Sequence, residues 1–183
     1  MLEIKGSIYI STYNINGLNN KISILTKLLS NEDIDIIALQ ETHLRNDMKA
    51  VFRDFSMLNS GTIINKWSGT AFLVKNSIYK FVRKFVPISE MMAALYLNTA
   101  FKPTILLNIY APPTLKERKP FFDELENVID TLPKRYNLIV MGDFNTKIGK
   151  DEYYLKNNVI MLRWSAEMDR IVSLYLKYVK IKI

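Results

Sequence analysis

The stretch that most constrains the fold of this chain is residues 138–145, LIVMGDFN. Its four leading apolar residues predict a buried strand that stops at Gly142. In α/β proteins the groups just past strand ends face a ligand crevice. Because side chains alternate along an extended segment, we expect Asp143 and Asn145 to project to one side and Phe144 to the other. The sequence thus predicts a carboxylate beside a carboxamide at the end of a buried strand.

The apolar pattern of the whole chain predicts an α/β fold with mixed sheets. Strands are predicted over residues 7–13, 34–39, 69–74, 78–86, 92–97, 104–110 and 136–141, and helices over residues 18–29, 47–55 and 117–132. The opening strand–helix–strand unit favours parallel pairing. Hairpins expected at residues 75–77 and 102–103 favour antiparallel pairing.

Length and composition favour one globular domain over residues 1–183. The chain is 49% apolar, with six Gly and six Pro, and is long enough to bury a sizeable core. It has no cysteine, which excludes thiol chemistry and cysteine-type zinc sites and does not point to an oxidising compartment. A single histidine, His43, excludes a site that needs two imidazoles from one chain.

The charge of the chain fits a protein that meets phosphate backbones. It carries 25 Lys plus Arg against 18 Asp plus Glu, a net charge of +7. An AT-rich genome, which raises Lys together with Ile and Asn, is the alternative explanation. The first residues lack the apolar core of a signal peptide, and no segment approaches the roughly 18 apolar residues of a membrane helix. We therefore expect an intracellular protein, in cytoplasm or nucleus, that is not secreted and has no membrane partner.

Four of the predicted strands end in polar side chains. They are Asn14 and Asn16, Glu41, Tyr110, and Asp143 with Asn145. Each of these residues alone is common in turns or as a solvated side chain after a strand. Their joint occurrence at successive strand ends predicts a site for a divalent metal and a phosphate.

The chemistry that these groups favour is metal-assisted hydrolysis of a phosphoester. Mg²⁺, with Mn²⁺ as the alternative, takes one or two carboxylates, which Glu41 and Asp143 can supply. The metal would polarise a phosphate oxygen and stabilise the leaving group. Asn14 and Asn145 can orient the phosphate or the attacking water without adding charge, and Tyr110 can donate a hydrogen bond to a phosphate oxygen.

Five stretches of the chain resemble successive motifs of the endonuclease/exonuclease/phosphatase superfamily, in the family's order. They are TYNINGL (12–18), IIALQETHL (36–44), GTAFLV (69–74), LLNIYAPP (106–113) and IVMGDFNT (139–146). The residues of these motifs are most similar to those of the apurinic-type endonuclease domain of non-LTR, LINE-like retrotransposons. The resemblance covers residues 7–148 and leaves 149–183 as a divergent tail. It implies a four-layer α/β sandwich, two mixed sheets flanked by helices and incomplete at its C-terminal side; one large mixed sheet with a docked tail helix is the alternative.

The resemblance implies a role for each residue of the site. Glu41 would be the metal carboxylate and Asn14 an active-site amide. Tyr110 would contact the phosphate, Asp143 would activate or position the nucleophilic water, and Asn145 would assist it in the transition state. It singles out no residue for nucleic-acid binding.

Other positions depart from the family pattern. Asn16 stands where many relatives carry Asp, which weakens a second metal position, and His43 is expected to have a structural or rim role. Residues 165–171 are faintly similar to a Ser-Arg-Ile-Asp motif, which would make Asp169 its aspartate. The alternatives are a C-terminal helix with Asp169 solvated, and an edge strand at residues 180–183. The family's closing Asp-His has no counterpart.

Together these observations predict a Mg²⁺-dependent endonuclease acting on DNA. The first alternative is a catalytically impaired remnant that binds nucleic acid or another protein. A phosphatase of small phosphoesters or phosphoinositides is the second. Fewer strands than in relatives would leave a sheet edge open, so a partner chain, an oligomer or the divergent tail must cover it.

Overall fold

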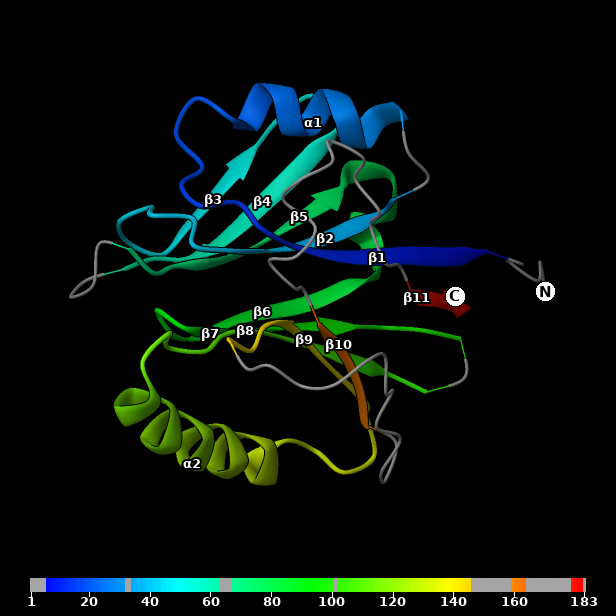
Figure 1. Ribbon diagram of the computed structural model, residues 1–183. Helices are drawn as coiled ribbons and strands as arrows, with labels where there is room; N and C mark the ends of the chain where they lie inside the picture. The colour runs from blue at the N-terminus through cyan, green and yellow to red at the C-terminus, as the bar shows by residue number, and fades with distance from the viewer. Residues whose placement is uncertain are drawn as a thin grey trace.

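The computed structural model describes residues 6–31, 34–62, 67–100, 102–145, 159–163 and 179–182. Two β-sheets lie face to face, with helix α1 (Ile22–Asn31) over the outer face of one and helix α2 (Leu115–Thr131) over the outer face of the other (Figure 1). The predicted four-layer α/β sandwich is confirmed. No helix among the described residues has the length and apolar character that crossing a membrane requires.

The first sheet has the strand order β11-β1-β2-β5-β4-β3. Its members are β1 (Ser7–Asn14), β2 (Ile36–Gln40), β3 (Met48–Val51), β4 (Phe55–Ser60), β5 (Thr70–Lys75) and β11 (Val179–Lys182). β1 and β2 are parallel because α1 joins them as a crossover, and the register places Asn14 opposite Gln40. β2 and β5 are antiparallel, so this sheet is mixed.

The second sheet has the strand order β10-β9-β8-β7-β6. Its members are β6 (Val82–Ser89), β7 (Met92–Leu97), β8 (Thr104–Tyr110), β9 (Asn137–Asp143) and β10 (Val159–Arg163). β7 and β8 form the predicted antiparallel hairpin, whereas α2 carries the chain from β8 to a parallel β9. The register places Tyr110 opposite Asp143 at the carboxyl ends of β8 and β9.

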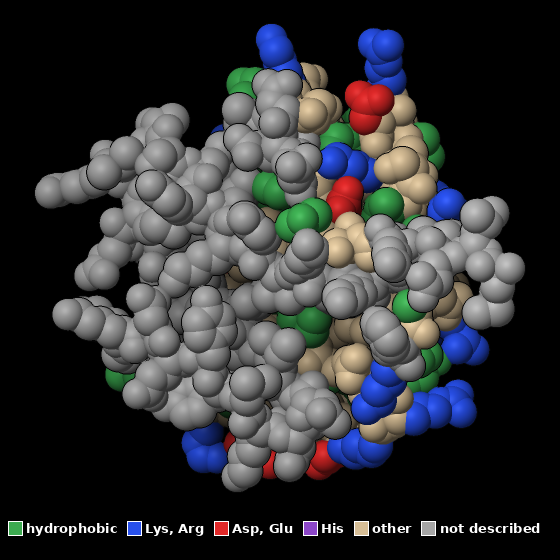
Figure 2. Space-filling view, turned by 90° about the vertical axis from the view of Figure 1, so that its right-hand side faces the viewer, with side chains coloured by type: hydrophobic (Ala, Val, Ile, Leu, Met, Phe, Trp, Pro, Cys, Tyr) green, Lys and Arg blue, Asp and Glu red, His purple; other side chains and the backbone are tan. Residues whose placement is uncertain are grey.

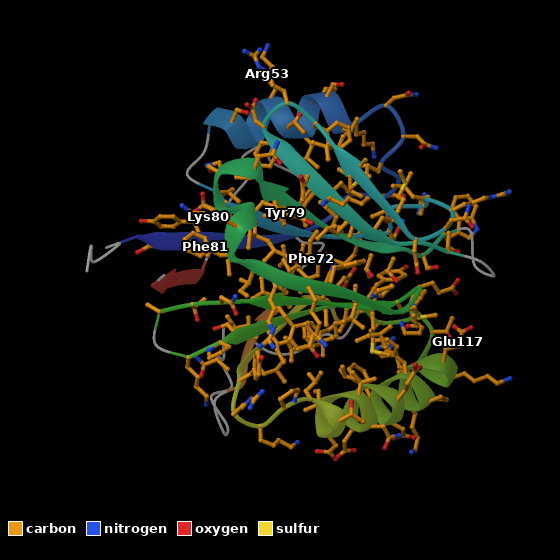
Figure 3. The ribbon with its side chains drawn as sticks, turned by 180° about the vertical axis from the view of Figure 1, so that it is seen from behind. Arg53, Phe72, Tyr79, Lys80, Phe81 and Glu117 are labelled. Carbon is orange, nitrogen blue, oxygen red and sulfur yellow. The ribbon has the colours of Figure 1, made fainter. Side chains whose placement is uncertain are left out.

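Apolar side chains from alternate positions fill the space between the sheets. Fully buried residues of β1, β2 and β5, such as Ile10, Ile36 and Phe72, meet those of β7 and β8, such as Leu95 and Leu106. Figure 3 shows Phe72 in this space, and its ring lies edge-to-face against that of Phe85, with the ring centroids 6.4 Å apart. Successive side chains of a strand point to opposite faces of the sheet, so every second residue of these strands faces the space between the sheets.

The helices bury one side each. In α2, Phe121 and Leu125 are four residues apart and pack on the outer face of the second sheet. The helix begins at Leu115, two residues before the predicted start, so Pro120 lies beyond its first turn. Proline there removes one internal backbone hydrogen bond, a cost that the packing of the apolar face offsets.

Two predictions about the middle of the chain are wrong. Residues 47–55 do not form a helix, because Met48–Val51 is the edge strand β3, paired antiparallel with β4. Residues 69–86 do not form a hairpin, because the 3-10 helix η1 (Asn76–Phe81) carries the chain from β5 in the first sheet to β6 in the second (Figure 3). Pairing between strands is a tertiary property that an apolar pattern does not specify.

The tail supplies a strand to each sheet. β11 pairs antiparallel with β1, and β10 pairs parallel with β9. The edge strand predicted at residues 180–183 is observed over Val179–Lys182. The alternative of a C-terminal helix falls on residues 164–178, which lie outside the described residues. β11 and β10 are therefore the outermost strands at one edge of each sheet.

Candidate active site

The space between the sheets changes from apolar to polar along the strands. Ile10, Ala38 and Leu106 lie in the apolar core. Two residues further along the same strands are Thr12, Gln40 and Asn108, all buried. One or two residues further along the chain are the predicted site residues Asn14, Glu41 and Tyr110, and β9 ends in Asp143. Parallel strands deliver their carboxyl ends to one edge of a sandwich, which is why distant motifs meet here.

Asn14 is the centre of this arrangement. Its Nδ2 donates hydrogen bonds to Glu41 Oε1 at 2.9 Å and to Asp143 Oδ2 at 3.0 Å. Asn14 and Asp143 are buried, with 8% and 5% of their surfaces exposed. Two carboxylates from different sheets thus converge on one amide nitrogen.

Asp143 and Asn145 form a tight turn after β9. Asp143 Oδ1 accepts a hydrogen bond of 2.9 Å from the backbone N–H of Asn145, whose Nδ2 donates to Ala111 O at 2.7 Å. Phe144 is buried in the cluster beneath α2, as its alternation predicted. Asn145 has a φ of 45°, so it lies in a turn and does not extend the strand. Gly142, which we expected to end the strand, lies inside β9.

Tyr110 points to the same carboxylates. Burial raises the pKa of its hydroxyl first, and a side-chain hydrogen bond with Glu41 and the charges of Glu41 and Asp143 raise it further. The hydroxyl therefore keeps its proton at neutral pH. It is available as a hydrogen-bond donor to an anion at this site.

Glu41 is held in an unusual backbone conformation. Its φ is 52°, in the left-handed region that non-glycine residues seldom occupy. Its carbonyl accepts a hydrogen bond of 2.7 Å from Gly17 N, and the next residue, Thr42, donates its N–H to Gly69 O at 3.1 Å. Such conformations persist where the surroundings over-determine them, often at functional sites.

The other candidate positions lie at the rim or outside the described chain. Asn16 is exposed with a φ of 45°, and its backbone N–H donates to Asn14 Oδ1 at 3.1 Å. His43 Nε2 lies 3.7 Å from Glu41 Oε2, and the His43 ring lies edge-to-face with that of Trp67 at 5.4 Å. Asp169 lies outside the described residues.

Sequence reasoning missed the polar layer beneath the site. Gln40 Nε2 donates to Asn108 Oδ1 at 2.7 Å and to Thr12 Oγ1 at 2.9 Å. The signal that could have found this layer is Asn108 itself, a polar residue inside the otherwise apolar run of β8. A fully buried amide must find hydrogen-bond partners, and here they belong to the opposite sheet.

The oxygen ligands gathered at this site are of the kind that binds Mg²⁺. Glu41 and Asp143 offer carboxylate oxygens, the hard ligands that this ion takes. Two partly or fully buried like charges that share one amide donor are stabilised by a cation. Within the described part of the chain, no three His, Cys, Asp or Glu side chains gather into a metal-binding group. Two carboxylates are within the one or two that proteins commonly supply to Mg²⁺, together with water.

Comparison with known proteins places this geometry in context. A sequence profile described as the Endonuclease/Exonuclease/phosphatase family matches residues 11–159. Craniofacial development protein 2 of Bos taurus is 23% identical over 156 residues, which make up 78% of this chain and 25% of that protein. The chain thus spans a quarter of the length of this curated relative.

Solved structures share the fold. The 3' phosphatase NExo from Neisseria, bound to product DNA hairpin, matches with a TM-score of 0.61 and 19% identity, over 78% of this chain and 60% of that one. The AP endonuclease LMAP from Leishmania major matches with 0.58 and 19%, over 75% and 55%. The endonuclease domain of TRAS1, a telomere-specific non-LTR retrotransposon, matches with 0.58 and 16%, over 77% and 60%.

Proposed function

Because the chain belongs to the Endonuclease/Exonuclease/phosphatase family, we propose that it is a Mg²⁺-dependent endonuclease that hydrolyses DNA phosphodiester bonds. The observation that carries this proposal is the convergence of Glu41 and Asp143 on the Asn14 amide, beside the Tyr110 hydroxyl. Carboxylates, an amide and a protonated phenol around one point are suited to a metal-bound phosphate.

Each residue then has a role in the reaction. Mg²⁺ held by Glu41, with Asp143 close by, would polarise a phosphate oxygen and stabilise the leaving oxygen. Asp143 would accept a proton from the attacking water, since hydrogen bonds from Asn14 and Asn145 orient both of its oxygens. Tyr110 would donate its proton in a hydrogen bond to a non-bridging phosphate oxygen.

Charge supports a nucleic-acid substrate. The net charge of +7 favours a polyanion over a neutral ligand. On the face in Figure 2, Lys and Arg side chains stand out at the top and along the lower right edge. The DNA hairpin named with the structure of NExo supports DNA as the polymer. A small phosphoester stays the weaker alternative.

A second candidate function is nucleic-acid binding without turnover. The observation that favours it is that the sequence has one imidazole, and this imidazole lies beside Glu41. The sequence has no second imidazole to stand for the closing histidine that the family resemblance implies. Loss of one positioned acid or base commonly costs 10² to 10⁴ in rate.

Nicking of supercoiled plasmid with Mg²⁺ separates the two candidates. We expect the wild type to nick, and Glu41→Ala and Asp143→Ala to be slower by about 10² to 10⁴. Asp123→Ala is the matched control, because Asp123 is an exposed carboxylate of α2 paired with Lys119. Salt-sensitive DNA binding without nicking by the wild type would support the second candidate, and nicking unchanged in both site variants would exclude this site.

A further inference from the structure

Asn108 joins the two sheets directly beneath the site. Its Nδ2 donates to the backbone oxygens of Leu39 at 2.9 Å and Ala71 at 3.0 Å, and its Oδ1 accepts from Gln40 Nε2 at 2.7 Å. Asn108 belongs to the second sheet, and all three partners belong to the first. The donors and the acceptor of this fully buried amide are therefore all used across the sandwich.

The linked residues stand next to the site in the chain. Asn108 precedes Tyr110 by two residues on β8, and Gln40 directly precedes Glu41. Gln40 also donates to Thr12, two residues before Asn14. The strands that deliver Asn14, Glu41 and Tyr110 are thus tied to Asn108 or to its partner Gln40 just below the site. The strand that delivers Asp143, β9, pairs with β8 beside Asn108.

The polar layer leaves part of its hydrogen-bonding capacity unused. Beneath it the same strands pack apolar side chains. Within the described chain, Gln40 Oε1 and Thr70 Oγ1 are buried without a hydrogen-bond partner, and a buried polar atom left unpaired costs free energy. An apolar layer would avoid that cost but would provide no directional contact between the sheets.

We infer that Asn108 is a positioning residue that fixes the separation of the sheets at the site. Asn14 and Glu41 come from the first sheet, whereas Tyr110 and Asp143 come from the second. The hydrophobic effect that drives apolar packing has no direction, whereas three hydrogen bonds at one residue fix the distance between the groups that they join. Asn108 thereby sets how far Glu41 lies from Asp143. This inference rests on the proposed function.

The test compares Asn108→Leu with Leu106→Ala. Leu106 lies two residues earlier on β8 in the apolar core, so its truncation destabilises the same strand without touching the polar layer. We expect Asn108→Leu to lower kcat about 100-fold with KM within threefold, since a displacement of about 1 Å at a reacting centre has that effect. The Mg²⁺ concentration for half-maximal rate should rise at least threefold. Leu106→Ala should keep both values within twofold of the wild type.

A second readout needs neither metal nor turnover. The Asn14 side-chain amide signals in a ¹H–¹⁵N spectrum report its bonds to Glu41 and Asp143. They should shift in Asn108→Leu and stay in place in Leu106→Ala. If the wild type fails to nick DNA, the proposed function fails, while these signals still decide the positioning role. Unchanged Asn14 signals, or kinetics that match those of Leu106→Ala, would overturn the inference.

A milder variant covers the case in which Asn108→Leu does not fold. Gln40→Met keeps the length of the side chain and removes its bonds to Asn108 and Thr12, while Asn108 keeps both backbone partners. We expect shifted Asn14 signals and a smaller fall in kcat, about 10-fold. Wild-type signals and kinetics in a folded Gln40→Met would also contradict the inference.

Discussion

Asn14 and Asp143 lie 129 positions apart in the sequence, yet a hydrogen bond of 3.0 Å joins Asn14 Nδ2 to Asp143 Oδ2. The same nitrogen bonds Glu41 Oε1. One neutral amide therefore ties together the two carboxylates of the site, one from each sheet.

Asn14→Ala should weaken the protein as well as the site. Removing the amide leaves two carboxylates without a shared donor, and a lost buried hydrogen bond to a charged group costs about 1.5 to 3 kcal/mol. The free energy of unfolding by urea in EDTA should fall by about that amount. The control is Asn98→Ala at an exposed position just after β7, which should change it by less than about 0.5 kcal/mol. Equal effects of the two variants would contradict this role of Asn14.

Mg²⁺ should stabilise the wild type in the absence of DNA. A ligand that binds only the folded chain adds about 2.7 kcal/mol at 100 times its Kd. The Tm measured by differential scanning calorimetry should rise with Mg²⁺ and return with EDTA. Glu41→Gln should remove most of the rise, since it deletes the proposed metal carboxylate. A rise of the same size in Glu41→Gln would show that Mg²⁺ binds elsewhere.

The Tyr110 hydroxyl should lose its proton at a higher pH than an ordinary tyrosine, and Glu41 should contribute to this rise in pKa. Because its pKa in the folded chain is raised, the unfolded chain loses this proton first. Stability is therefore unaffected below a pH of about 10 and falls as the pH rises above it. Tyr110→Phe should make the loss of stability above that pH less steep.

Near-ultraviolet titration of the folded protein should show the same dependence on Glu41. Glu41→Gln should lower the pKa of one tyrosine, though not to its ordinary value, because burial is the larger cause. Tyr96 is the internal control: burial and Tyr136, not Glu41, raise its pKa. An unchanged tyrosine titration in Glu41→Gln would contradict the contact.

Gly142→Ala should strongly destabilise the fold. A Cβ there would lie 1.9 Å from the Ile109 carbonyl oxygen, and the φ of 135° is one that other residues rarely adopt. Backbone strain and overpacking each cost about 1 to 3 kcal/mol, so the loss should exceed about 3 kcal/mol in urea unfolding. Gly17→Ala, whose Cβ would lie 3.1 Å from His43 Nδ1 at a φ of 84°, should lose less. The reverse order would contradict the close approach of β8 to β9.

The spacing of apolar residues was sufficient to predict most of the helices and strands. The alternation in β1 and the apolar run of β9 describe a strand wherever it pairs, and the stripe of α2 needs one face to bury. The wrong predictions, at residues 47–55 and 69–86, concern segments whose structure depends on which strand they pair with. The apolar run after Asn76 suits a strand, but whether it returns to β5 or crosses to the other sheet depends on which surface lies nearby.

For the candidate site too, the sequence predicts some features and only the structure shows others. The sequence by itself determined which residue types stand at the strand ends, because Asn14, Glu41, Tyr110, Asp143 and Asn145 each follow a readable strand. Only the tertiary structure decided that Asn14 bonds two carboxylates at once and that Asn108 links the sheets below them. These contacts join residues up to 129 positions apart, and they exist because two sheets pack at one register and distance. Side-chain packing and hydrogen bonds across the sandwich together set that register, and no short stretch of sequence encodes it.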